Sequence, residues 1–295
     1  MQTKVPHGMQ LGSSWPESLC GTQRRSPAEF VRFSGQSPWR ESGSTKKLVG
    51  FRSPVKPSCS LKKFPASISE TGRVHSPFDE ISALQVKSRD IQPYLDGRCV
   101  YLVGLMGSGK TTVGKIIAQE LGYSFVDSDT LIEQSLDEIS VADIFKTHGE
   151  AFFRDKETEA LKKLSCMHRL VISTGGGAVI RHINWRYMRQ GISVWLDVPL
   201  EALAQRITSV GTASRPLLHY EGGDPYMKTL HRLTTLLEER SHCYANADAR
   251  VSLEYIAAKH GYREASCIPP PAIALEALEQ IENHVKDDVG YAAAF

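Results

Sequence analysis

The sequence has no long apolar run, few cysteines and almost no excess of charge of either sign. No stretch approaches the roughly 18 consecutive apolar residues of a membrane-spanning helix, which excludes a spanning segment. The six cysteines are scattered without a CxxC pair, which argues against a zinc ribbon or a disulfide scaffold and favours a reducing compartment. With a formal net charge of +2 and 41% hydrophobic residues over 295 positions, the composition is that of a soluble globular protein.

Charge is distributed unevenly along the chain. Residues 1–70 hold eleven Lys/Arg and four Asp/Glu, a net charge of +7, together with thirteen Ser and seven Pro. The remainder holds 24 basic and 29 acidic residues, a net charge of −5, which argues against nucleic acid as a partner. The first segment has no sustained apolar period and cannot offset its ordering entropy by burial, so we expect it to be disordered.

Three interpretations of this basic N-terminal segment are open. Its Ser-rich, acid-poor composition is typical of an organelle transit peptide, and it lacks the apolar core of a secretory signal. A plain disordered tail and a nucleic-acid-binding arm are the alternatives, although the latter would show dense Lys/Arg runs. Ser and Pro without an Arg-rich amphipathic helix favour a chloroplast over a mitochondrion. We predict a transit peptide over 1–70, a linker over 71–97 and a folded domain over 98–295, located in the plastid stroma after processing.

Short apolar runs alternate with helical patterns through the body of the chain. We expect strands over 99–103, 124–126, 170–172, 193–196 and 250–253. We expect helices over 111–121, 141–147, 150–164, 181–190, 199–207, 227–244 and 272–285, with a long loop over 209–226. Strands that alternate with helices predict an α/β fold with a parallel five-stranded sheet flanked by helices.

The strongest local motif is the run from Gly104 to Thr111, which matches G-x-x-x-x-G-K-[ST] between an apolar strand and a helix. Its glycines let backbone N–H groups converge on an anion at the start of a helix. Lys110 supplies a cation for the β- and γ-phosphates, and the Thr111 hydroxyl suits Mg²⁺. The motif predicts binding of a nucleoside triphosphate. A later N/T-K-x-D motif is absent, which argues against a GTPase, and the compact body favours a small-molecule kinase.

Two aspartates follow the second expected strand. Asp127 could face the metal while Asp129 faces an acceptor hydroxyl, which a carboxylate can orient and deprotonate. Alternatively, Asp129 caps the N-terminus of the helix that follows. The two residues by themselves do not decide between these interpretations.

Further candidates lie beyond the aspartates, and each has an ordinary structural explanation. Arg154 and Glu157 are three apart on a helix, so they form either a surface ion pair or a buried fork for an acidic substrate. The glycines at 175–177 are either a flexible connector or a place where a ligand touches backbone. Arg240 lies either on a solvated helix face or in the site, and Arg215 in the long loop could close over the nucleotide.

Six motifs occur in one order: GLMGSGKT, DSD, FFRDKE, TGGG, SRPLL and EER, with Tyr244 shortly after. This order and spacing, over roughly residues 98–255, resemble the shikimate kinase family, and the N-terminal segment resembles that of the plastid form in plants. The resemblance implies a P-loop kinase with a helical substrate-binding insert at about 129–165 and a mobile lid at about 209–226. It implies phosphorylation of the 3-hydroxyl of shikimate by ATP, a step of chorismate and aromatic amino-acid biosynthesis.

The resemblance also implies roles for individual residues. ATP contacts are expected from Gly107, Ser108, Gly109, Lys110, Thr111, Thr112 and Arg215, and the Mg²⁺ cofactor at Thr111 and, through water, at Asp127. Shikimate contacts are expected from Asp129, Arg154, Gly175, Gly176, Gly177 and Arg240, with Phe145 and Phe153 on the apolar side. Lys110, Asp129 and Arg215 would be catalytic. The implied partners are shikimate and ATP, with no nucleic acid and no membrane.

Two other functions are weighed against this one. A gluconate-type P-loop kinase would share the phosphate loop. The paired arginines favour a carboxylate substrate, and an assay of ADP release with a panel of acceptors separates the two kinases. A catalytically dead paralogue would have lost Lys110, Thr111, Asp129 or Arg154, and all four are present.

Overall fold

The computed structural model describes residues 77–210 and 224–292. The predicted transit peptide at 1–70, most of the predicted lid and Arg215 therefore lie outside the described residues. Within them, none of the helices is both long and apolar enough to cross a membrane.

The centre of the fold is a five-stranded parallel sheet, as predicted. Its strands are β1 (Val100–Val103), β2 (Ser124–Asp127), β3 (Leu170–Ser173), β4 (Ile192–Asp197) and β5 (Ala249–Ser252). They lie in the order β2-β3-β1-β4-β5, and every neighbouring pair is parallel. The chain leaves β1 toward one edge and later crosses to the other, so the order reverses at β1. In open α/β sheets ligands bind at such a switch point, outside the carboxyl ends of the strands.

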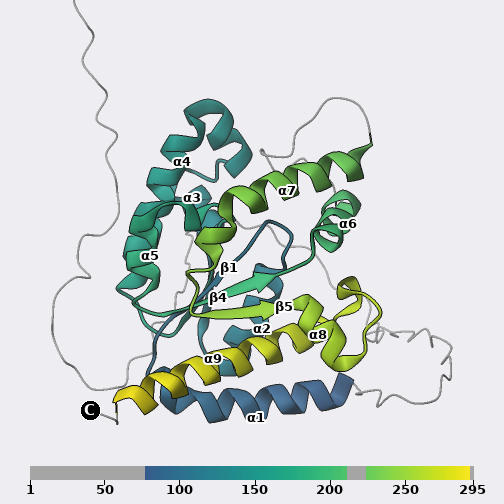
Figure 1. The fold of residues 1–295 in the computed structure, drawn as a ribbon. Helices are drawn as coiled ribbons and strands as arrows, with labels where there is room; N and C mark the ends of the chain where they lie inside the picture. The colour runs from purple at the N-terminus through teal and green to yellow at the C-terminus, as the bar shows by residue number, and fades with distance from the viewer. Residues whose placement is uncertain (1–76, 211–223, 293–295) are drawn as a thin grey trace, which may run out of the picture. The chain divides into compact units, whose positions relative to one another are not determined.

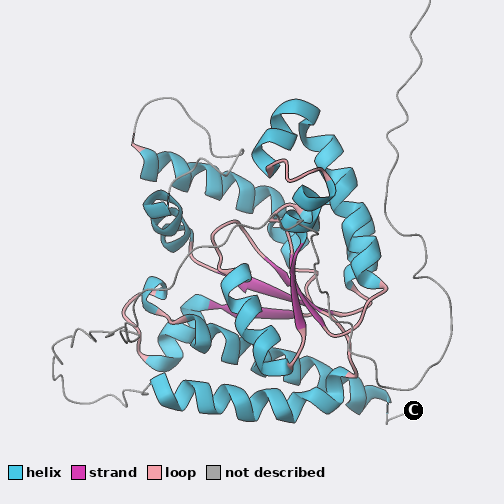
Figure 2. Cartoon of the chain, turned by 180° about the vertical axis from the view of Figure 1, so that it is seen from behind, coloured by secondary structure: helices cyan, strands magenta, loops and turns pink. Residues whose placement is uncertain are grey.

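Helices cover both faces of the sheet (Figures 1 and 2). They are α2 (Lys110–Leu121), α5 (His182–Met188), α6 (Leu200–Val210), α7 (Pro225–Tyr244), α8 (Leu253–His260) and α9 (Pro270–Ala292). Two short 3₁₀ turns, η1 (Ala178–Ile180) and η3 (Ala265–Cys267), complete the connections. Helix α2 ends at Gly122 in a left-handed conformation, as its sequence predicts, whereas α8 and η3 were not expected.

The helical insert consists of α3 (Ser128–Ser135) and α4 (Val141–Ser165). Ile132, Ile144, Phe153 and Ala160 form a small apolar cluster of their own, separate from the main core. The break predicted between 147 and 150 is present, because Gly149 has φ 82° and interrupts the helical backbone inside α4. The insert therefore presents two stiff segments beside the carboxyl end of the sheet.

The linker expected over 71–97 is wrong for residues 77–95, which form helix α1 (Pro77–Leu95). This helix lies along α9 (Figure 1), and its Leu84, Ile91 and Leu95 are at most 2% exposed. Lys87 forms an ion pair of 2.7 Å with Glu282. The apolar stripe of this helix is narrow, so the sequence pattern alone does not predict it. Such a helix is stabilised mainly by packing against its neighbour, which a one-dimensional pattern does not show.

Candidate functional site

The phosphate loop joins β1 to α2 and depends on three glycines in the left-handed half of backbone space. Gly104, Gly107 and Gly109 have φ of 146°, 80° and 92°. A β-carbon on Gly104 would lie 2.7 Å from the carbonyl oxygen of Leu196, so no larger residue fits there. The loop therefore turns its N–H groups toward the N-terminus of α2, where an anion is favoured.

Lys110 folds back over this loop. Its Nζ donates to the carbonyl oxygens of Gly104 at 2.8 Å and Leu105 at 2.9 Å, and the side chain is buried. Burial lowers the pKa of Lys110 to about 8, against the opposing effect of Asp129 and Asp127. The lysine therefore stays mostly protonated at neutral pH, and its cation is held beside the anion cradle.

Thr111 and Asp127 form an oxygen pair next to the loop. The Thr111 hydroxyl donates to Asp127 Oδ2 at 3.0 Å. Asp127 Oδ1 accepts from the backbone N–H groups of Asp129 and Thr130, so Asp127 caps α3 and the alternative that Asp129 does so is wrong. A hydroxyl and one carboxylate suit Mg²⁺, which retains waters and takes phosphate oxygens as its other ligands. Clusters of three or more His, Cys, Asp or Glu able to hold a metal are absent from the described part of the chain.

A cavity of about 510 Å³ opens beside the phosphate loop. Its lining includes residues 107–113, Arg206 and Val210 of α6, and Ser266, Ile268, Pro270 and Ile273 near the start of α9. No sequence motif marks Arg206 or the residues at 266–273 as part of a binding site. Three consecutive prolines at 269–271 were the only local signal there, and they match no ligand-binding motif.

Asp129 lies at the start of α3 with its carboxylate close to Gly175. Burial and the neighbouring Asp127 carboxylate raise its pKa to about 6, while Lys110 and Arg154 act in the opposite direction. Its Oδ1 accepts a long hydrogen bond of 3.5 Å from the Ser128 hydroxyl. The carboxylate thus has a proton affinity suited to a general base near neutral pH.

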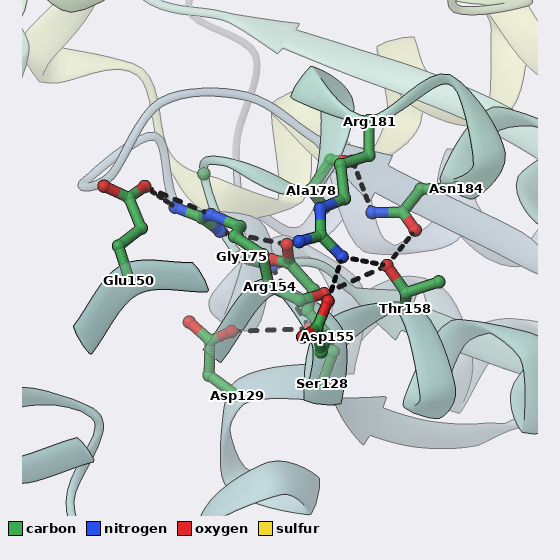
Figure 3. A network of polar contacts seen from close by, with 12 residues as sticks. Ser128, Asp129, Glu150, Arg154, Asp155, Thr158, Gly175, Ala178, Arg181 and Asn184 are labelled. Carbon is green, nitrogen blue, oxygen red and sulfur yellow. Dashed lines mark hydrogen bonds and ion pairs between the residues drawn. The ribbon is translucent and has the colours of Figure 1, made fainter. Parts of the chain in front are cut away.

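Arg154 is buried, so its pairing with Glu157 is not the ordinary surface ion pair that the sequence left open. Its Nη1 donates to both carboxylate oxygens of Glu157, at 2.9 and 3.1 Å, and its Nε and Nη2 donate to Glu150 (Figure 3). The guanidinium carbon lies 5.9 and 5.4 Å from the ring centroids of Phe145 and Phe153. Burial raises the pKa of Glu157, and the Arg154 cation counteracts this. Two carboxylates and two rings therefore define where the guanidinium lies.

Gly175 and Gly177, after β3, are required by close packing, beyond any role as a connector. A β-carbon on Gly175 would lie 2.7 Å from both Asp129 Oδ1 and Glu157 Oε1. A β-carbon on Gly177 would overlap the Arg154 guanidinium. Since only hydrogen fits at these positions, the loop backbone lies directly against the acidic and basic groups of the insert.

Arg240 of α7 is 5% exposed, so a solvated helix face is wrong for it. Its Nη1 donates to the carbonyl oxygen of Gly176 at 3.3 Å, and the Tyr244 hydroxyl donates to the same oxygen at 2.7 Å. The Nε of Arg240 is buried and has no hydrogen-bond partner among the described residues. An unpartnered buried donor of this kind is costly unless a ligand supplies an acceptor.

The fold thus brings together nearly all of the residues singled out in the sequence. The phosphate loop, the oxygen pair and the Asp129 carboxylate lie at the carboxyl ends of β1 and β2. Two buried arginines, from α4 and α7, reach the glycine loop after β3. Such an arrangement can hold a polyphosphate beside an acidic molecule and offer a base to a hydroxyl between them.

Comparisons with known proteins agree on one family. The family model described as "Shikimate kinase" matches residues 106–282. The chain is 54% identical to "Shikimate kinase, chloroplastic" of Solanum lycopersicum over 97% of each chain. It is 60% identical to "Shikimate kinase 1, chloroplastic" of Arabidopsis thaliana, over 76% of this chain and 73% of the relative. The solved structure of a shikimate kinase from Acinetobacter baumannii in complex with shikimate is 31% identical, with a TM-score of 0.55 over 66% of this chain and 97% of that chain.

Proposed function

Because this chain belongs to the shikimate kinase family, we propose that it transfers the γ-phosphate of ATP to the 3-hydroxyl of shikimate, giving 3-phosphoshikimate and ADP. The observation that carries this proposal is the pocket itself. A phosphate loop and two buried arginines flank one carboxylate, and shikimate has one acid group and several hydroxyls.

The chain's own residues hold the nucleotide. The N–H groups of 107–112 and the Lys110 ammonium bind the phosphates, and the cavity toward Arg206, Ile268 and Pro270 leaves room for the base. Thr111 and Asp127 would hold Mg²⁺, which neutralises phosphate charge when bound. Arg215, outside the described residues, is proposed to reach the same phosphates.

The acceptor, shikimate, binds on the side of Asp129 that is opposite the phosphate loop. Arg154 and Arg240 bind its carboxylate, which also gives the buried Nε of Arg240 an acceptor. Phe145 and Phe153 cover the apolar side of the ring, and Gly175, Gly176 and Gly177 let it approach the backbone. Asp129 orients the reacting hydroxyl and takes its proton. No covalent intermediate is needed, because phosphoryl transfer is catalysed mainly by positioning and charge stabilisation.

The relatives named chloroplastic support a plastid location for this chain. The match to the tomato protein spans 97% of this chain and so includes most of the basic N-terminal segment. We propose that the segment is a transit peptide removed before Pro77, because α1 begins there and packs its apolar side against α9. Cleavage further along the chain would expose the apolar surface that α1 covers.

The test is an acceptor panel. Purified protein is supplied with ATP and Mg²⁺ and then with shikimate, gluconate or no acceptor, and ADP release is followed in a coupled assay. Of the three assays, we expect ADP release only in the one that contains shikimate. Equal rates with shikimate and gluconate would contradict the substrate assignment, and no turnover with either would favour a paralogue without catalytic activity.

The pH dependence of the rate should report on Asp129. Its pKa is raised to about 6, so the carboxylate is protonated, and lost as a base, when pH falls through 6 rather than through the usual value near 4. We expect kcat/KM for shikimate to be highest near pH 7 and to fall roughly tenfold per unit below about pH 6. Direct chromatographic measurement of 3-phosphoshikimate avoids acid-sensitive coupling enzymes. A rate that stays level down to pH 5 would remove Asp129 from the role of base.

A further inference from the structure

A polar chain links the helix that carries Arg154 to the turn that follows the glycine loop. Arg181 donates through Nη1 to Asp155 Oδ1 at 2.7 Å and to the Thr158 hydroxyl at 3.4 Å (Figure 3). The Thr158 hydroxyl lies 2.9 Å from Asn184 Oδ1, and Asn184 Nδ2 donates to the carbonyl oxygen of Ala178 at 2.9 Å. These hydrogen bonds therefore join Asp155, the residue after Arg154, and Thr158, one turn beyond Arg154, to Ala178, the residue after Gly177.

The orientation of Asn184 follows from its partners. The side chain is fully buried, and its amide nitrogen is occupied by a backbone carbonyl, so the amide oxygen must face Thr158. The Thr158 hydroxyl also lies 2.9 Å from the backbone oxygen of Arg154. Its single hydrogen goes to one of these two oxygens at a time. The Thr158 hydroxyl thus links the backbone of Arg154 to Asn184 of α5.

The position of this link bears directly on the substrate arginine. Gly177 leaves no space for a β-carbon beside the Arg154 guanidinium, so a small change in the separation of α4 from the loop changes that contact. Glu150 and Glu157, by contrast, lie on the same helix as Arg154 and move with it. They orient the guanidinium but do not set its distance from the loop.

We propose that Thr158 and Asn184 are positioning residues for shikimate binding: they hold α4 at the separation from residues 175–178 at which Arg154 and the loop backbone bind the substrate together. The proposal rests on the proposed function, in which Arg154 binds the carboxylate. Neither residue touches the substrate. Their effect is expected on the acceptor side, because their side-chain hydrogen bonds go to Arg154, Arg181, Ala178 and each other rather than to the phosphate loop.

The test compares Michaelis constants in the full chain. The Thr158→Val substitution removes the hydroxyl but keeps a side chain of nearly the same shape. The buried amide oxygen of Asn184 then loses its hydrogen-bond donor. We expect the KM for shikimate to rise roughly three- to tenfold, as for the loss of one hydrogen bond, while the KM for ATP stays within about twofold. Thr158→Ser retains the hydroxyl and should restore the parental KM. Asn184→Leu should raise the KM for shikimate in the same way.

The matched control is Thr234→Val in α7. Its hydroxyl also bonds back to the carbonyl four residues earlier, that of Leu230 at 3.0 Å, and it is likewise half-buried. Its KM for shikimate should equal that of the parent. Thermal unfolding of every variant shows which are folded at the assay temperature. If Asn184→Leu does not fold, the Thr158→Val and Thr158→Ser pair is sufficient.

A merely structural role predicts a lower melting temperature with both KM values unchanged, and that result would overturn the proposal. So would an equal rise in both KM values, or a Thr158→Ser variant that behaves like Thr158→Val. These outcomes differ from a failure of the proposed function. If the parent does not phosphorylate shikimate, both proposals fall, whereas an active parent with unaltered Thr158 variants overturns the positioning role alone.

Discussion

Lys110→Ala should reduce kcat to the limit of detection, a loss of at least roughly a hundred- to a thousandfold. Lys110 is the cation held at the loop by Gly104 and Leu105, and it is buried where the transferred phosphate would lie. Its loss removes positive charge where negative charge develops during transfer, and water does not replace a fixed cation in a buried site. The measurement is a coupled ADP assay at saturating shikimate and ATP.

The control for this variant lies on the same helix. Lys115 of α2 is exposed and lies 5.7 Å from the ring centroid of Phe125, away from the loop. Lys115→Ala should retain parental turnover. Circular dichroism should show that Lys110→Ala keeps its helices, because loss of one side chain leaves the glycine turns intact. Near-parental kcat in a folded Lys110→Ala variant would remove the lysine from the mechanism.

Arg154→Ala should weaken capture of shikimate far more than binding of ATP. A charge-assisted hydrogen bond contributes about 1.5–3 kcal/mol, so the KM for shikimate is expected to rise roughly ten- to a hundredfold. The KM for ATP should change by less than about threefold, because Arg154 lies on the acceptor side of Asp129. Initial rates measured while each substrate is varied at saturation of the other provide both constants.

Removal of Arg154 also leaves the buried Glu157 without its cation, which by itself destabilises the fold. A double variant, Arg154→Ala with Glu157→Gln, removes this charge and separates lost stability from lost binding. We expect it to melt at a higher temperature than Arg154→Ala while its KM for shikimate stays raised. Lys156→Ala, which breaks an exposed ion pair with Glu159 on the same helix, should behave like the parent. Equal losses in the two KM values of Arg154→Ala would contradict the assigned role.

Local patterns were sufficient for the sheet and the phosphate loop. Strands β1, β3 and β4 are short, largely apolar runs, and the sequence from Gly104 to Thr111 needs only its own glycines and the start of α2 to form an anion site. The break at Gly149 is local for the same reason, since a positive φ depends on the absence of a side chain. Local structure that depends only on residues adjacent in the sequence was therefore predictable from the sequence.

Burial of charged residues was not predictable in this way. Arg240 and Arg154 occur in helical patterns that equally suit a solvated face, and only the approach of the glycine loop encloses them. Helix α1 was missed because its partner, α9, lies almost two hundred residues further along the chain, as the ion pair between Lys87 and Glu282 shows. The cavity lining at 266–273 likewise has no motif and depends on how α9 meets α6 and the phosphate loop.

The amino-acid sequence by itself determined the α/β alternation, the anion cradle and the kinds of side chain available to an acidic substrate. Only the tertiary structure decided which arginines are buried and what separates α4 from the loop after β3. The physical reason is the distance along the sequence over which the relevant interactions act. Backbone conformation and helix starts are set over a few residues, whereas desolvation and pKa depend on atoms that come from distant parts of the chain.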